Sequence, residues 1–238
     1  MKTLSRILPP LAFIAGSSFM ASSAVAQSAG DTVFNVGWFY IQPNDSSEPL
    51  KRTAPSSMAG TIPNSSASVG NANTLAFSLT HFVSDNMAMT LDAGLPPKFT
   101  LTGAGSLAGL GVLGTAKQWS PALLGKWYFG SATSAFRPFV GAGVTYVRYS
   151  NIELSNSFQA ASGGTATADL SSSWAPVANI GATYQLDKNW SLLFSLSYVP
   201  LKTKADITGM TPSNVQTKAN TSLTLNPLVA LVSVGYKF

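Results

Sequence analysis

The sequence predicts an all-β protein, an eight-stranded antiparallel transmembrane β-barrel, and three observations support this prediction. Hydrophobic residues make up 45% of the 238 residues and charged residues only 10%, whereas about 25% charged residues is usual in soluble domains. The chain ends on an alternating apolar row that closes with two aromatic residues. Long and short connections alternate between the predicted strands, as they do in barrels of bacterial outer membranes.

The first 26 residues have the features of a secretory signal and are excluded from the fold. Lys2 and Arg6 give a basic start, Leu11 to Met20 form an apolar core, and a small-residue cleavage site ends at Ala26. This order of basic, apolar and small residues is typical of a cleaved signal. Residues 27–238 are therefore predicted to form one barrel domain. No later stretch approaches the ~18 consecutive apolar residues that a spanning helix needs.

Composition excludes several classes of function. Once Lys2 and Arg6 are set aside, 12 of the 14 Lys and Arg residues stand against 9 Asp and Glu residues, a balance too weak and dispersed for nucleic-acid binding. The chain has no cysteine and one histidine, so neither a thiolate nucleophile nor a transition-metal site is expected. The glycines between Gly103 and Gly114 lack the GxGxxG spacing of nucleotide sites. No cofactor is predicted.

The N-terminal half contains four predicted strands. Each shows the two-residue alternation of a strand, and the ranges are 31–42, 71–83, 87–94 and 120–129. The second and third strands are joined by Ser84-Asp85-Asn86, a short turn, because Asp and Asn side chains bond their own backbone and tolerate left-handed dihedrals. Residues 43–69, rich in Pro, Ser, Asn and Gly, and residues 95–119 are predicted as long loops.

The C-terminal half contains four more predicted strands, at 136–150, 174–186, 190–204 and 221–238. Strand 190–204 alternates most clearly, and the last strand carries an apolar residue at every second position from Leu228 to Tyr236 and Phe238. Its terminal aromatics suit a membrane interface. A buried strand of a soluble sandwich would show the same row, so this strand alone does not decide between the two folds. Residues 151–173 and 205–220 are predicted as loops.

The order of the connections favours the barrel over the sandwich. Short turns and long loops alternate along the chain, and both chain ends fall on the side of the short turns. A sandwich has no reason to sort its connections by length, whereas outer-membrane barrels have short periplasmic turns and long outer loops. Closure also removes sheet edges, which lipid cannot hydrogen-bond. Eight strands leave a lumen wide enough for packed side chains or one small ligand.

Four stretches resemble a known family. They are FVSDNMAMTLDAGLPPKF from Phe82 to Phe99, SPALLGKWYFGSATSAFRPFVGAGVTY from Ser120 to Tyr146, SSWAPVANIGATYQL from Ser172 to Leu186, and NPLVALVSVGYKF from Asn226 to Phe238. They resemble the OmpW family of outer-membrane proteins, which includes AlkL-like proteins of alkane uptake. The likeness covers essentially the whole chain after the signal, except the first loop.

The resemblance implies a barrel in the bacterial outer membrane whose apolar channel lets small hydrophobic molecules pass the lipopolysaccharide leaflet and leave sideways into the membrane. The lumen-facing positions are apolar where ordinary small barrels are polar, and the predicted channel lining is Phe39, Ile41, Leu193, Val199, Leu201, Leu225, Val229 and Leu231. Such a lining would favour apolar solutes, because each buried methylene is worth about 0.8 kcal/mol. The alternative is that these residues fill a closed core.

The resemblance also assigns roles to three further residues. Trp174 matches a family tryptophan at the channel mouth and would form a constriction there, or else lie at the membrane interface as a girdle aromatic. Pro96 and Pro97 lie where the family's third strand carries a proline. Proline has no N–H for the ladder, so pairing must lapse there. This lapse is predicted to be a lateral gate; the alternative is an ordinary strand end.

Two further groups of residues lie at the predicted outer end of the barrel. Basic residues near the predicted outer strand ends suit lipopolysaccharide phosphates, or else form a solvated rim, and they include Lys51, Arg52, Lys98, Arg148, Lys202 and Lys204. Apolar side chains in the glycine-rich loop contact substrate at the entrance or pack against other loops, and they are Leu107, Leu110, Val112 and Leu113.

No enzymatic activity is expected. The one histidine, His81, is predicted to face lipid beside a short turn, at the rim opposite the outer leaflet. The predicted function is passive uptake of small hydrophobic molecules by a monomer embedded in outer-membrane lipid. The alternative is a structural or receptor barrel that binds lipopolysaccharide, a phage or a toxin without transport.

Overall fold

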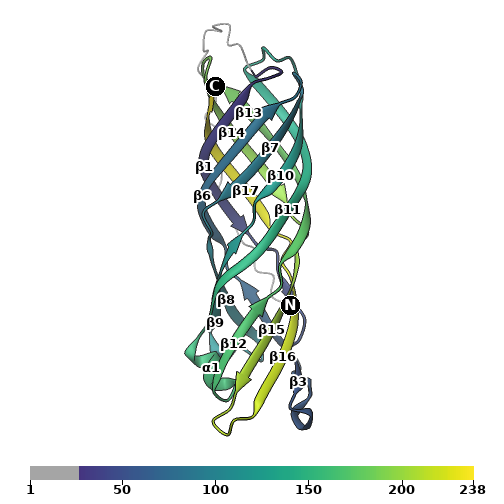
Figure 1. The fold of residues 1–238 in the computed structure, drawn as a ribbon, viewed down its shortest axis with the longest axis vertical. Helices are drawn as coiled ribbons and strands as arrows, with labels where there is room; N and C mark the ends of the chain where they lie inside the picture. The colour runs from purple at the N-terminus through teal and green to yellow at the C-terminus, as the bar shows by residue number, and fades with distance from the viewer. Residues whose placement is uncertain (1–26) are drawn as a thin grey trace, which may run out of the picture.

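Residues 27–238 of the computed structural model form a closed β-barrel continued at one end by a β-rich extension (Figure 1); the predicted signal, residues 1–26, lies outside the described residues. The barrel strands are β1 (Thr32–Gln42), β6 (Ala72–Phe82), β7 (Met87–Gly94), β10 (Ala122–Tyr128), β11 (Phe136–Leu154), β13 (Ser173–Gln185), β14 (Trp190–Tyr198) and β17 (Leu228–Lys237). They pair antiparallel in the order β10-β7-β6-β1-β17-β14-β13-β11, and pairing of β10 with β11 closes the ring. The predicted eight-stranded antiparallel barrel is confirmed.

The outer wall of the barrel is apolar. On β17, Leu231 and Ser233 are buried whereas Val232 and Val234 are exposed, which confirms the alternation predicted for the C-terminal strand. Aromatic side chains gather on the outer wall toward both ends of the barrel, where ring and polar atoms suit the membrane interfaces; they include Trp119, Tyr146, Trp174 and Tyr198 at one end and Trp127, Tyr184, Trp190, Tyr236 and Phe238 at the other. Within residues 27–238, no helix is long and apolar enough to cross a membrane.

The short turns lie at the end of the barrel that carries the C-terminus, at the top of Figure 1. In the turn between β13 and β14, the Asp187 carboxylate accepts the N–H groups of Asn189 and Trp190, each at 2.8 Å. These two bonds, to Trp190 first, lower the pKa of Asp187. In the turn between β6 and β7, the Ser84 hydroxyl accepts the Met87 N–H at 3.0 Å. Side-chain acceptors of this kind are what the turn residues predicted.

The four regions predicted as loops are largely β-sheet, which corrects the prediction. They form an extension, here called the outer head, visible at the bottom of Figure 1. One sheet joins β5 (Ser65–Val69), β8 (Lys98–Gly105), β9 (Val112–Trp119) and the far end of β11. The other joins β12 (Thr165–Leu170), β15 (Lys202–Met210), β16 (Gln216–Thr224), β3 (Lys51–Ala54) and β4 (Gly60–Thr61), with β2 (Ser46–Ser47) beside β16.

Short helical segments complete the head. They are α1 (Asn156–Ala161) and two 3-10 turns, η1 (Ser56–Met58) and η2 (Ala108–Leu110). Glycine and serine in these regions predict loops, but strand pairing with neighbours outweighs the weak intrinsic preference of these residues.

Two strands predicted as continuous are interrupted between barrel and head. The predicted strand 190–204 stops at Tyr198 and resumes as β15 at Lys202, and the predicted strand 221–238 divides between Thr224 and Leu228. Pro200 and Pro227 fall in these breaks, and each lacks the N–H that a ladder requires. By contrast, β11 runs from barrel to head without a break, pairing with β13 in the barrel and with β9 in the head.

Inside the barrel, near the short turns, packed side chains close the lumen. This cluster, here called the lower plug, contains Phe82, Tyr128, Arg137, Phe139, Leu193 and Leu231, all at most 2% exposed. The Tyr128 ring lies 4.9 Å from the rings of both Phe82 and Phe139, and the Arg137 guanidinium lies 5.3 Å from the Tyr128 centroid. Arg137 also donates to the backbone carbonyls of Gln27, at 2.7 Å, and Asp85.

We expect Tyr128→Ala to lower the free energy of unfolding by about 3–5 kcal/mol, because deleting a fully buried aromatic ring removes transferred apolar surface and leaves a cavity. The measurement is urea-induced unfolding in phospholipid vesicles, followed by heat-modifiable gel mobility. The neighbouring Trp127 faces outward and is 46% exposed, so Trp127→Ala is the matched control with a smaller loss. If both variants lose the same free energy of unfolding, packing of Tyr128 in the lower plug contributes no more stability than contacts on the outer wall, which would contradict the prediction.

Candidate functional site

Four cavities lie between the head and the centre of the barrel. The mouth cavity has a volume of about 230 Å³ and includes Arg52, Met58 and Leu110 in its lining. The upper cavity, about 80 Å³, lies deeper in the head and includes Leu113, Leu154 and Thr221. The middle cavity, about 30 Å³, includes Phe99, Tyr149 and Leu225. The lower cavity, about 80 Å³, lies within the barrel and includes Phe39, Asp92, Leu124 and Val229.

Neighbouring cavities share walls, so they form one series from the head to mid-barrel. The mouth and upper cavities share Leu50, Leu107, Phe158 and Ile207. The upper and middle cavities share Leu101, Ala116, Leu170 and Leu223. The middle and lower cavities share Ile41, Gln118, Leu201 and Pro227. Eleven of these twelve residues have apolar side chains, so a solute that moves between cavities passes apolar groups at each step.

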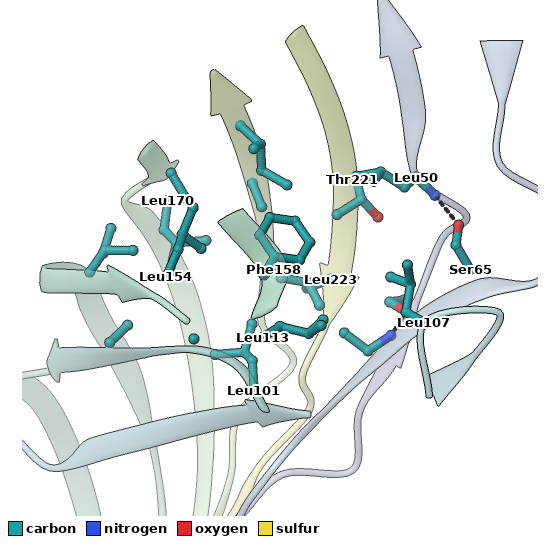
Figure 2. Close-up of a pocket in the computed structure, with 18 of the residues that line it drawn as sticks. Leu50, Ser65, Leu101, Leu107, Leu113, Leu154, Phe158, Leu170, Thr221 and Leu223 are labelled. Carbon is teal, nitrogen blue, oxygen red and sulfur yellow. Dashed lines mark hydrogen bonds between the residues drawn. The ribbon is translucent and has the colours of Figure 1, made fainter. Parts of the chain in front are cut away.

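Figure 2 shows the upper cavity, where leucine side chains from both head sheets point toward Phe158. Phe158 belongs to the one-turn-and-a-half helix α1 and is 6% exposed. The helix is fixed at its start by Ser155, whose hydroxyl accepts the Phe158 N–H at 3.2 Å as an N-cap. The Phe158 ring therefore occupies a defined position between the mouth and upper cavities. On the far side of the cavity, the Leu50 N–H donates to the Ser65 hydroxyl at 2.7 Å.

The lower cavity ends above the lower plug and has a polar edge. Most of its lining is aliphatic, but Asp92, Thr145 and Ser197 also reach it. Thr145 donates to the Pro121 carbonyl at 2.9 Å and Ser197 accepts from Asn179 at 2.8 Å. Below this edge the lumen is polar and tightly filled, with buried serine, threonine, lysine and arginine side chains. The series of cavities therefore has no visible continuation through the plug in the described part of the chain.

The ladder between neighbouring strands of the barrel wall lapses beside the lower cavity, at Pro96 and Pro97. The β7–β10 ladder ends at the pair Asp92–Ala122, and these segments are next joined where the Gln118 N–H donates to the Pro97 carbonyl at 3.1 Å. The two prolines lie between the end of β7 and the start of β8. Across from them is Pro121, which also lacks an N–H. We call residues 93–97 and 118–121 the seam; Ser120 of the seam also lines the lower cavity.

Six of the nine residues predicted to line the channel line a cavity; they are Phe39, Ile41, Val199, Leu201, Leu225 and Val229. Leu193 and Leu231 also point inward but lie in the lower plug, below the cavities, which corrects their prediction. Trp174 is corrected as well. Its neighbour Ala175 faces inward and is 2% exposed, so Trp174 faces outward, where it is 71% exposed and packs against Tyr146 with the two rings tilted and their centroids 5.0 Å apart.

Most of the predicted lipopolysaccharide contacts face outward just beyond the aromatic residues of the barrel's outer end. Lys98, Arg148, Lys202 and Lys204 are exposed on β8, β11 and β15. Arg148 pairs in register with Trp119, and Lys98 lies directly opposite Lys117, with Glu153 3.6 Å from Lys98. Lys51 is exposed on β3, whereas Arg52 is half-buried and lines the mouth cavity.

His81 is exposed on the outer wall, as predicted from its parity, and its Nδ1 lies 3.0 Å from the Thr32 hydroxyl. Of the apolar residues in the glycine-rich region, Leu107, Leu110 and Leu113 line cavities, whereas Val112 is 45% exposed.

Several cavity residues were missed because they lie in regions predicted as loops. They include Leu50, Leu101, Leu154, Phe158, Leu170 and Ile207. A signal was present for some of them: in β15, Thr203 and Ala205 are buried whereas Lys202, Lys204 and Asp206 are exposed, which is strand alternation. The predicted strand was ended at Lys204, so the alternation was not followed as far as Ile207.

The family model described as "OmpW family" matches residues 28–238, which is nearly all of the described chain. The chain belongs to the OmpW family. It is 29% identical to outer membrane protein W of Vibrio cholerae over 90% of this chain and 91% of that protein. It is 31% identical to outer membrane protein AlkL of Ectopseudomonas oleovorans over 75% of this chain and 72% of that protein.

A solved structure of an outer-membrane barrel superposes closely. The crystal structure of outer membrane protein OprG from Pseudomonas aeruginosa gives a TM-score of 0.80 at 27% identity, covering 90% of this chain and 99% of that chain. As an OmpW-family barrel, the protein is located in the outer membrane. The short turns therefore face the periplasm and the outer head faces the cell exterior.

Proposed function

We propose that this OmpW-family barrel is a passive channel for small hydrophobic molecules, which enter through the head and leave sideways into the membrane. The observation that supports this most directly is the series of four cavities with shared apolar walls between the head and mid-barrel. An apolar solute gains about 0.8 kcal/mol per methylene on leaving water for such surroundings. The cavities would thus carry it past the polar saccharide layer. The proposed mechanism needs no catalytic residue.

The exit is proposed at the seam because the straight path is filled. In the lower plug, the rings of Phe82, Tyr128 and Phe139 pack against one another. The buried guanidinium of Arg137 beside them makes this part of the lumen unfavourable for an apolar solute. The seam, in contrast, borders the lower cavity through Gln118 and Ser120 and lacks ladder bonds beside its prolines. A lapse in the ladder can widen without breaking hydrogen bonds, and lipid lies directly outside it.

Outward basic side chains of the head are proposed to hold lipopolysaccharide phosphates. Lys98, Lys117 and Arg148 lie on adjacent strands, and Lys98 and Lys117 are directly opposed. Like charges in that position repel each other, and a bound phosphate would relieve this repulsion. Arg suits bidentate contact with phosphate oxygens. The position next to Trp119 matches the height of lipid headgroups.

We expect Leu201→Asp and Leu223→Asp together to reduce uptake of a medium-chain alkane at least about tenfold. Leu223 lies in the wall between the upper and middle cavities and Leu201 between the middle and lower ones, and placing a carboxylate in an apolar passage costs several kcal/mol, of which ~1.4 gives tenfold. The measurement is initial uptake of radiolabelled octane by expressing cells, with folding checked by heat-modifiable mobility.

The matched control is Ser222→Asp, beside Leu223 on the opposite face of β16 and outside the cavity linings. It should transport like the parent. No uptake above that of empty cells by the parent, for several solutes, would contradict the channel and favour a structural or receptor barrel.

Ser120→Trp should reduce octane uptake to a similar degree, because a ring at this half-buried position of the seam fills the proposed exit. The same uptake assay tests it, and Ser131→Trp in the periplasmic turn is the control. Undiminished uptake in folded Ser120→Trp would rule out the seam as the exit while leaving the cavities in place.

Exchanging Lys98, Lys117, Arg148, Lys202 and Lys204 for Gln should lower the amount of lipopolysaccharide that copurifies with the barrel several-fold. These side chains supply charge-assisted hydrogen bonds to phosphate. Lys188, exposed in a periplasmic turn, provides the control exchange, since that rim contacts no lipopolysaccharide. Phosphate analysis of the purified protein is the measurement, and an unchanged amount in the five-fold variant would contradict the proposed contact.

A further inference from the structure

The polar edge of the lower cavity contains an acceptor that the barrel leaves unused. Asp92 lines this cavity and is 8% exposed. Its Oδ1 is buried, and within the described part of the chain it has no hydrogen-bond partner. Buried polar atoms in native proteins are nearly always partnered, so an exception calls for an explanation such as a ligand. Of the other polar side chains that line this cavity, Thr145 and Ser197 already have partners, and Gln118 and Ser120 lie in the seam.

The neighbours of Asp92 do not satisfy it. Ser78 lies directly opposite on β6, yet its hydroxyl is also buried and unpartnered among the described residues. The Lys126 ammonium is likewise buried without a hydrogen bond there and lies 4.8 Å from the Phe139 centroid. Lys126 attracts Asp92 electrostatically, but among residues 27–238 no hydrogen bond or close ion pair joins the two side chains. Lys126 does not line the lower cavity, and Asp92 is the charged residue of that lining.

We propose that Asp92 is a binding site for the hydroxyl group of a hydrocarbon alcohol, whose chain lies upward in the lower and middle cavities. This rests on the proposed channel and specifies its substrate class. The two cavities share Ile41, Leu201 and Pro227, which surround a chain with apolar groups. The hydroxyl donates to the Asp92 carboxylate, and a hydrogen bond to a charged acceptor is stronger than one between neutral groups.

The chemistry of the passage selects a hydroxyl over the other common polar ends. A carboxylate would meet the negative charge of Asp92 directly. An ammonium would have to cross the apolar upper and middle cavities as an ion, which is far more costly than moving a hydroxyl. An alkane crosses easily but leaves the Asp92 oxygen unpartnered.

The position of Asp92 gives the site a role in release. Asp92 and Ala122 form the last register pair before the seam, so an alcohol held by Asp92 lies beside the proposed exit. Binding there would retain an oxygenated hydrocarbon at the exit longer than an alkane of the same length. The barrel would then distinguish its solutes at the end of the passage.

The test measures binding to the full mature barrel in phospholipid nanodiscs by ¹⁹F NMR. The probes are 8-fluorooctan-1-ol and 1-fluorononane, which have the same number of chain atoms, with partition into empty nanodiscs subtracted. We expect the alcohol to bind the parent about tenfold more tightly than the alkane, a factor that corresponds to about 1.4 kcal/mol. Asp92→Leu should abolish this preference and leave binding of the alkane unchanged or stronger.

Two further variants serve as controls for folding and for position in the lumen. Asp92→Asn keeps an acceptor oxygen and a similar size, so it should retain part of the preference even where Asp92→Leu folds poorly. Thr90→Val lies on the same strand and lumen face, but Thr90 bonds to Thr80 at 3.0 Å and does not line the cavity, so it should keep the full preference.

Equal affinities of the two probes in the parent would overturn the proposal and indicate a site that holds water only. A preference that survives in both Asp92 variants would also overturn it. Binding of neither probe would instead contradict the channel itself, so failure of this site and failure of the proposed function give different results.

Discussion

The rest of the structure depends on closure of one hydrogen-bonded ring, the pairing of β10 with β11. In lipid, no water satisfies an unpaired backbone N–H or C=O, so an open edge would cost several kcal/mol per group. Closure fixes eight strands, and eight strands fix a narrow lumen. What fills that lumen then decides what the barrel can do: packed rings and polar groups toward the periplasm, apolar cavities toward the head.

Alternation along each strand made the barrel predictable from sequence, and its limits are equally physical. Parity tells which wall a side chain faces but not its height in the lumen. Leu193 and Leu201 share a parity, yet Leu193 lies in the plug and Leu201 between two cavities. Position along the strand gives the height, but the level at which packed side chains give way to cavities depends on residues from all eight strands. For Trp174, in contrast, parity alone gives the right answer: alternation in its own strand places it on the outer wall, whereas the family resemblance placed it at the channel mouth.

The outer head was the least predictable part because its strands are held by partners distant in sequence. Residue Lys218 on β16 pairs with Ala54 on β3, and neither segment is apolar enough to be recognised alone. The cavities of the candidate site could not be predicted for the same reason, since four separate segments supply the wall shared by the mouth and upper cavities. By contrast, Pro96 and Pro97 were informative on their own, because a missing N–H acts wherever the neighbours are.

The interruptions between barrel and head have a consequence for how such proteins diversify. Most barrel strands end at or near a proline before the head begins, and β11 alone passes through both. The ladder of the barrel therefore does not impose its register on the head. Insertions and substitutions in the head can alter the entrance while the membrane-inserted wall folds as before. If the barrel is the channel proposed above, its solute preference at the head and its insertion into the membrane are separable traits under selection.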